Sequence, residues 1–148
     1  MNSSPSIRPA TPDDEAQILT LMNGFCESEG KSLDEDRARA GLAPLLESDT
    51  HGKVLVAESA NGLTAYAVIC WSWSVEIGGA EACLDEIYVS TRGEGTGSAL
   101  INAVRDACIA RGMRRIFLET EAINANARRL YERHGYEEED SIWMALTL

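Results

Sequence analysis

The segment of residues 84–100 constrains the possible fold of this chain more than any other part of the sequence. Its first part, residues 84–89, is rich in β-branched and aromatic residues, as expected for a strand. Gly93, Gly95 and Gly97 follow, and glycine lets the backbone turn tightly while leaving N–H groups uncovered. Apolar residues then recur at helical spacing. This order places free N–H groups at the positive end of a helix dipole, which suits a phosphate or pyrophosphate. The alternative is a plain loop that needs glycine for its shape alone.

The length and charge of the chain narrow the class of protein. With 148 residues, we expect one domain over residues 1–148, large enough for a proper core. The formal net charge of −11 argues against a nucleic-acid partner, because such binding relies on basic patches. It suits a cationic substrate, and it suits mere solubility equally well. No apolar run is long enough to cross a bilayer and no signal segment is evident, so we expect a cytoplasmic protein without a membrane partner.

The cysteines and histidines indicate no metal site. Cys26, Cys70, Cys83 and Cys108 are widely separated and have no paired spacing, which favours reduced thiols over a disulfide frame or a zinc site. The chain has only two histidines, too few to form a metal site on their own.

The hydrophobic pattern predicts a mixed α/β (α+β) fold with a mostly antiparallel sheet flanked by helices. A helix crossover between residues 80–89 and 116–120 makes those two strands parallel. Pro44 predicts a kink or a split in the second helix. Tyr136 and then residues 142–148 are expected to close the sheet as a final hairpin. In chain order the predicted elements are a strand at 7–10, helices at 12–29 and 33–47, strands at 53–58, 63–73 and 80–89, a helix at 98–111, a strand at 116–120 and a helix at 124–134.

One interpretation of the glycine turn is a dinucleotide site. Gly93, Gly95 and Ser98 nearly match the glycine fingerprint of a Rossmann unit, and Glu119 ends the next strand where a ribose-binding acid would lie. However, the third glycine is missing and no second nucleotide-binding half follows. An NAD(P)-dependent oxidoreductase therefore stays an alternative.

Two motifs resemble those of a known family. Residues 92–97, Arg-Gly-Glu-Gly-Thr-Gly, resemble the Arg/Gln-x-x-Gly-x-Gly/Ala loop of the GNAT superfamily of acetyl-CoA-dependent N-acetyltransferases. Residues 124–136 resemble its Asn-x-x-Ala-x-x-Leu/Phe-Tyr-x-x-x-Gly-Phe/Tyr helix, and the predicted element order is similar from about residue 6 to 148. The resemblance implies a GNAT-like fold with a splayed parallel strand pair. It also implies acetyl transfer from acetyl-CoA to a small amine acceptor by direct transfer in a ternary complex. A non-catalytic acyl-CoA-binding regulatory module on the same fold is the alternative.

The resemblance also implies which residues bind the coenzyme. Asn124 would line the thiol end of the pantetheine, although it could equally cap its helix. Tyr131 would protonate the leaving thiolate as a general acid, since a neutral phenol keeps its proton at pH 7; the alternative is a core tyrosine. The backbone groups expected to pair with the pantetheine are those of Ile87, Tyr88 and Val89, and those expected to bind the pyrophosphate are Arg92, Gly93, Glu94, Gly95, Thr96, Gly97 and Ser98. Only two residues separate Val89 from Arg92, fewer than in many members of the family, which leaves the phosphate contacts open.

The acceptor side is less defined. Asp85 and Glu86 should lie on opposite faces of one strand, so that one of them faces the acceptor cleft as a general base, and we favour Glu86 slightly. Proteins of this fold are often dimers, and an edge strand such as the final hairpin could pair with a second copy as a homodimer. Further candidates for the acceptor pocket, each of which could instead be an ordinary surface acid or packing aromatic, are Glu27, Glu29, Trp71, Trp73, Glu76 and Glu119.

Overall fold

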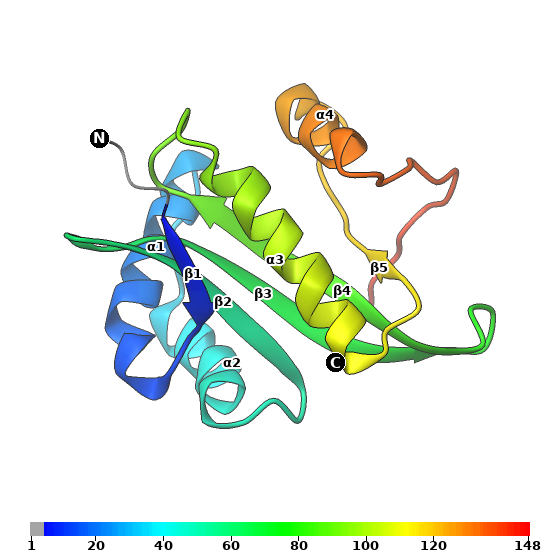
Figure 1. Cartoon of the computed structure of the whole chain (residues 1–148), viewed down its shortest axis with the longest axis horizontal. Helices are drawn as coiled ribbons and strands as arrows, with labels where there is room; N and C mark the ends of the chain where they lie inside the picture. The colour runs from blue at the N-terminus through cyan, green and yellow to red at the C-terminus, as the bar shows by residue number, and fades with distance from the viewer. Residues whose placement is uncertain (1–4) are drawn as a thin grey trace.

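A five-stranded sheet in the order β1-β2-β3-β4-β5 forms the centre of the protein, and its computed structural model describes residues 5–148. Helices α1 and α2 cover one face of the sheet and α3 covers the other (Figure 1). All strand pairs are antiparallel except β4–β5, as predicted. The elements are β1 (Ser6–Pro9), the 3-10 helix η1 (Pro12–Asp14), α1 (Glu15–Ser28), α2 (Glu35–Glu47), β2 (Gly52–Ser59), β3 (Gly62–Ser74), β4 (Gly79–Val89), α3 (Thr96–Arg111), β5 (Ile116–Phe117) and α4 (Ala125–Arg133).

The core has two layers because β3 is buried on both faces. Tyr66 and Val68 pack against α1 and α2, whereas Ala67 and Ile69 pack against α3. All four side chains are at most 3% exposed. The nearly continuous apolar run of this strand predicts such two-sided burial.

Helix α2 is not split at Pro44. It is a single helix that ends at Glu47, three residues beyond the proline. Proline removes the N–H bond to the carbonyl four residues earlier, and its ring crowds that carbonyl, which here belongs to the exposed residue Ala40. Water can satisfy that carbonyl, so the helix continues.

A β-bulge interrupts the pairing of β3 with β4. Val68 pairs with Glu86 and the next residue, Ile69, pairs with Leu84, so that Asp85 is the extra residue on β4. A bulge breaks the alternation of side chains along a strand. Asp85 and Glu86 therefore face the same side, toward α1 and α2, and the prediction that they lie on opposite faces is wrong.

The far edge of the sheet is shorter than predicted. β4 and β5 pair only through Ala82–Ile116 and Cys83–Phe117, so β4 beyond Cys83 has no strand partner on that edge within residues 5–148. The predicted final hairpin is also absent, because residues 136–148 form no strand. A two-residue β5 offers little ladder for a further strand to join. The large apolar side chains of this last segment are exposed, namely Ile142, Trp143, Met144, Leu146 and Leu148.

Candidate active site

The glycine turn between β4 and α3 forms an open cradle. Gly95 precedes the first residue of α3 with a φ of 74°, and Gly93 has a φ of 87°, both in the left-handed region that favours glycine. A Cβ added at either position would meet no atom within 4 Å. The first N–H groups of α3 have no partner within the helix. The turn therefore has room for an anion at the positive end of a 16-residue helix.

Helix α4 lies against this turn, so the two sequence motifs meet in space. A Cβ at Gly97 would lie 3.5 Å from Leu130 Cδ2 of α4 and 3.9 Å from Val89 Cγ2 of β4. His134 Nε2, just after α4, lies 3.1 Å from Ser98 Oγ in the first turn of α3. The motif of residues 124–136 thus forms one wall beside the end of β4.

Tyr131 and Asn124 both belong to this wall. Tyr131 is half-buried, its ring centroid lies 5.9 Å from that of Tyr136, and burial raises the pKa of its phenol. It therefore holds its proton at neutral pH and can donate it. Asn124 caps α4, because its side chain accepts a hydrogen bond from the Ala127 N–H at 3.2 Å.

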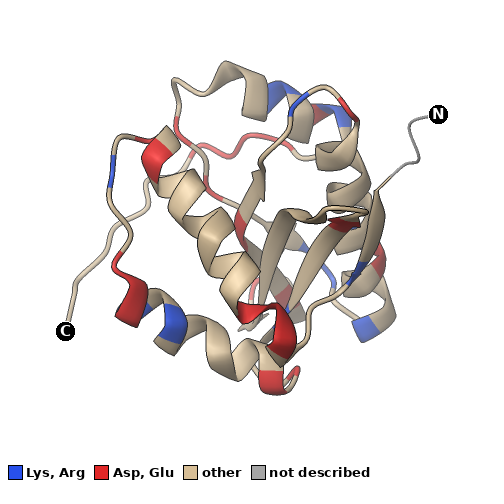
Figure 2. Cartoon of the chain, turned by 90° about the vertical axis from the view of Figure 1, so that its left-hand side faces the viewer, with Lys and Arg blue, Asp and Glu red and all other residues tan. Residues whose placement is uncertain are grey.

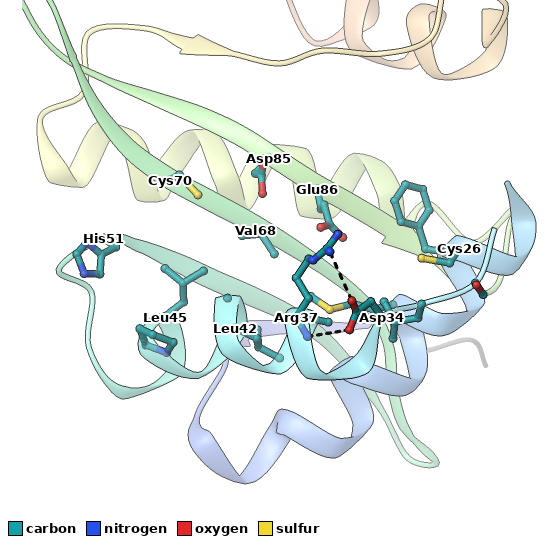
Figure 3. A pocket seen from close by; sticks show the side chains of 17 residues that line it. Cys26, Asp34, Arg37, Leu42, Leu45, His51, Val68, Cys70, Asp85 and Glu86 are labelled. Atoms are coloured by element: carbon teal, nitrogen blue, oxygen red, sulfur yellow. Dashed lines mark hydrogen bonds and ion pairs between the residues drawn. The ribbon is translucent and has the colours of Figure 1, made fainter. Parts of the chain in front are cut away.

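A second feature is a cavity of about 620 Å³ between the sheet and helices α1 and α2 (Figure 3). Asp85 and Glu86 both line it, since the bulge turns both side chains to this face. The Tyr66 hydroxyl donates a hydrogen bond of 2.7 Å to Glu86 Oε1. Burial raises the pKa of Glu86, the Tyr66 hydrogen bond opposes this rise, and the neighbouring charge of Asp85 adds to it. Glu86 is thus a more basic carboxylate than usual.

Other predicted acceptor residues lie outside this cavity. Trp73 is 73% exposed, and Glu76 lies in the turn between β3 and β4. The Trp71 indole N–H donates to the Asp49 carbonyl at 2.8 Å, while the Arg111 guanidinium lies 4.5 Å from its ring centroid. Asp49 and Arg111 therefore contact Trp71, which does not line the cavity.

The predicted acids of the remaining segments are exposed. Glu27 and Glu29 end α1 and the turn after it, near the cavity but not lining it. The negative charge of Glu29 nevertheless contributes to the raised pKa of Glu86. Glu119 follows β5 on the other side of β4.

The residues that α2 and β3 contribute to the cavity are not predicted from the sequence. Asp34, Arg37, Leu42, Leu45 and Tyr66 all contact the cavity or its acids. The only signal in the sequence was the spacing of the α2 leucines, which predicts an apolar face without saying what it faces. Tyr66 lies within the apolar run of residues 63–73, and nothing in that run indicates its hydrogen bond with Glu86.

Comparisons with known proteins point to one group. Residues 17–136 match the model of the acetyltransferase (GNAT) family. The chain belongs to this family. An uncharacterized N-acetyltransferase of Bacillus subtilis, YhfO, is 30% identical over 136 residues, which cover 90% of this chain and 91% of the relative.

Solved structures agree with the GNAT assignment. An integron cassette protein from the Cole Harbour Salt Marsh metagenome is 27% identical, with a TM-score of 0.87 over 99% of this chain and 93% of the other. A protein of Clostridium difficile 630 described as a "possible acetyltransferase" is 26% identical, with a TM-score of 0.85 over 99% of each chain. These likenesses extend over the whole sheet and the helices that form the site.

Charge in this GNAT chain is spread over several elements (Figure 2), with 24 acidic and 13 basic residues. Among residues 5–148, no three His, Cys, Asp or Glu side chains are placed to hold a metal ion. No helix within the same residues is long and apolar enough to cross a membrane. Within the cavity, the local negative charge comes from Asp85 and Glu86, whose carboxylates lie on the same face of β4.

Proposed function

We propose that this protein transfers an acetyl group from acetyl-CoA to the primary amine of a small cationic acceptor. The observation that carries the proposal is the position of β4. One side of its last residues, next to the glycine turn, has no strand partner within residues 5–148, and its bulge directs Asp85 and Glu86 into a cavity. A coenzyme and an acceptor can thus approach the same strand from two sides.

On the coenzyme side, the free backbone groups of Ile87, Tyr88 and Val89 pair with the pantetheine as an added strand would. The N–H groups of residues 92–98 bind the pyrophosphate. Family membership supports acetyl-CoA, and the open space over Gly93 and Gly95 supports the pyrophosphate position.

On the acceptor side, an ammonium group binds between Asp85 and Glu86. Glu86 takes one of its protons, and the neutral amine attacks the thioester carbonyl. The C–N bond forms and the C–S bond breaks, and the thiolate takes the proton of the Tyr131 hydroxyl. The nitrogen of the new amide still carries one excess proton, and this proton passes to the Tyr131 phenolate, which returns the tyrosine to its neutral form. Two cysteines line the cavity, Cys26 and Cys70, and burial raises the pKa of the Cys70 thiol, which makes it a poor nucleophile. The scheme gives neither cysteine a covalent role, so the acetyl group passes directly to the amine.

A calorimetric titration with acetyl-CoA, run beside NAD and NADP, tests the coenzyme site. Gly95→Trp should abolish acetyl-CoA binding by filling the cradle. Gly112→Trp is the matched control. The φ of Gly112 is 83°, close to the 74° of Gly95, and a Cβ added there also meets nothing within 4 Å. Gly112, however, lies at the C-terminal end of α3, away from the glycine turn.

Binding by the wild type and Gly112→Trp, but not by Gly95→Trp, supports the assignment. Binding of NAD in place of acetyl-CoA would instead indicate that the glycine turn is a dinucleotide-binding site. Acetyl-CoA binding without acetylation of any amine would instead favour a non-catalytic acyl-CoA-binding module.

A further inference from the structure

The wall of the cavity opposite the two acids is apolar except at the start of α2. It is formed by α1, α2 and the segment between them, and Figure 3 shows the α2 leucines across from the strand that carries Asp85 and Glu86. Apolar residues therefore form most of the cavity lining outside the two acids. The larger ones are Met22, Phe25, Leu33, Leu42, Leu45 and Val68.

The charged groups that the start of α2 contributes to the lining are already paired. The guanidinium of Arg37 lies 3.6 Å from Asp34 Oδ2, and the Arg37 backbone N–H donates to Asp34 Oδ1 at 3.1 Å. Asp34 thus has its counter-charge, and Arg37 repels a second cation. Among the described residues that line the cavity, only Asp85 and Glu86 offer an unneutralised negative charge, and both lie on the strand wall.

From this distribution we infer that the acceptor is a monoamine with an apolar body, an alkylamine or arylalkylamine. Its ammonium lies between Asp85 and Glu86, and its hydrocarbon part lies against the α1–α2 wall. The inference rests on the proposed acetyl transfer and names the acceptor class for it.

Acceptors with several charges fit the cavity poorly. A polyamine or an amino sugar would place its second and third ammonium groups beside the α2 leucines or Arg37. Burying a charge without a partner is costly, whereas burying a methylene is favourable. A volume of about 620 Å³ is also in the usual range for a pocket that encloses one small molecule.

The test compares acceptors on the intact chain at saturating acetyl-CoA. The panel contains ethylamine, butylamine, hexylamine and phenethylamine, together with spermidine and kanamycin. Acetylated product is measured by mass spectrometry, because the four free cysteines would react with a thiol reagent. One buried methylene contributes about fourfold to binding, so hexylamine should exceed ethylamine in kcat/KM by at least about tenfold even with partial burial.

Leu45→Asp places a charge in the apolar wall, and it should lower kcat/KM for hexylamine about tenfold while changing that for ethylamine little. Leu45→Ala tests the same contact if the aspartate variant does not fold. Ile109→Asp is the matched control, since Ile109 is 66% exposed on α3 at the other face of the sheet. It should leave both amines unchanged.

A flat response to chain length, or a preference for spermidine or kanamycin, would overturn the inference while acetyl transfer stands. If no amine is acetylated although acetyl-CoA binds, the proposed function itself fails, and the inference with it.

Discussion

Replacing Asp14 by asparagine should destabilise the fold at the point where β1 leads into α1. Asp14 is 5% exposed, and its two carboxylate oxygens accept hydrogen bonds of 2.8 and 2.9 Å from the Arg8 guanidinium. The Thr11 N–H donates a third bond, at 2.8 Å. The hydrogen bonds from Arg8 are the largest cause that lowers the pKa of Asp14, from 3.8 to about 2, despite the opposing effect of burial.

The size of the effect follows from this pKa. Each pH unit between the folded and unfolded pKa corresponds to about 1.4 kcal/mol, so the ionised carboxylate contributes roughly 2 kcal/mol to the free energy of unfolding at pH 7. Because the folded pKa is the lower one, this contribution is complete above pH 5. It falls to about half at pH 3 and is lost as the pH drops through about 2.

Urea unfolding followed by circular dichroism at pH 7 and pH 3 measures the effect, at values well away from the pI of about 4.6. Asp13→Asn is the matched control, because Asp13 lies in the same turn but is exposed. Asp14→Asn should lose roughly 2 kcal/mol at pH 7 and about half of that at pH 3, while Asp13→Asn should change little. A loss at pH 7 below about 0.5 kcal/mol, or one that does not shrink at pH 3, would refute this account of Asp14.

Three further outcomes are expected. Tyr66→Phe removes the hydrogen bond that favours the Glu86 carboxylate, so the pKa of Glu86 should rise further. The acidic limb of the pH profile of kcat/KM should then move to higher pH. If that limb does not move, Glu86 is not the base. Tyr131→Phe should lower kcat by about 10²–10⁴ with calorimetric acetyl-CoA affinity unchanged, whereas equal loss of both would mark a structural tyrosine. Trp143→Phe should remove a red-shifted, readily quenched component of fluorescence, because Trp143 is 74% exposed; loss of a blue-shifted component would mean that the C-terminal segment packs.

The turn and the helix after it could be predicted from sequence because their signals are local. Glycine at residues 93 and 95 is required by a positive φ at each position, and the apolar spacing of α3 reports its own buried face. The helix cap at Asn124 is local in the same sense. A motif whose geometry depends on a few neighbouring residues can be recognised without knowing the rest of the fold.

The last segment of the chain shows why long-range pairing is harder to predict. The apolar residues within 142–148 suit a strand, yet a strand also needs a partner edge. That edge is set by β5, which ends at Phe117 instead of residue 120. No residue near position 142 carries information about the length of β5.

The bulge at Asp85 is the feature that most affects the chemistry, and it too depends on cross-strand register. Without it, only one of Asp85 and Glu86 would face the cavity. With both present, burial and then the negative charge of Asp85 keep the pKa of Glu86 raised. A bound ammonium group favours ionisation of both carboxylates, because it supplies the opposite charge. Once Glu86 has taken a proton and the amine is neutral, that attraction is gone and the repulsion from Asp85 favours the protonated form. An acceptor with a second, permanent positive charge between Asp85 and Glu86 would still attract both carboxylates and so weaken the preference for protonated Glu86. The two acids therefore suit an amine that carries one positive charge and loses it on deprotonation.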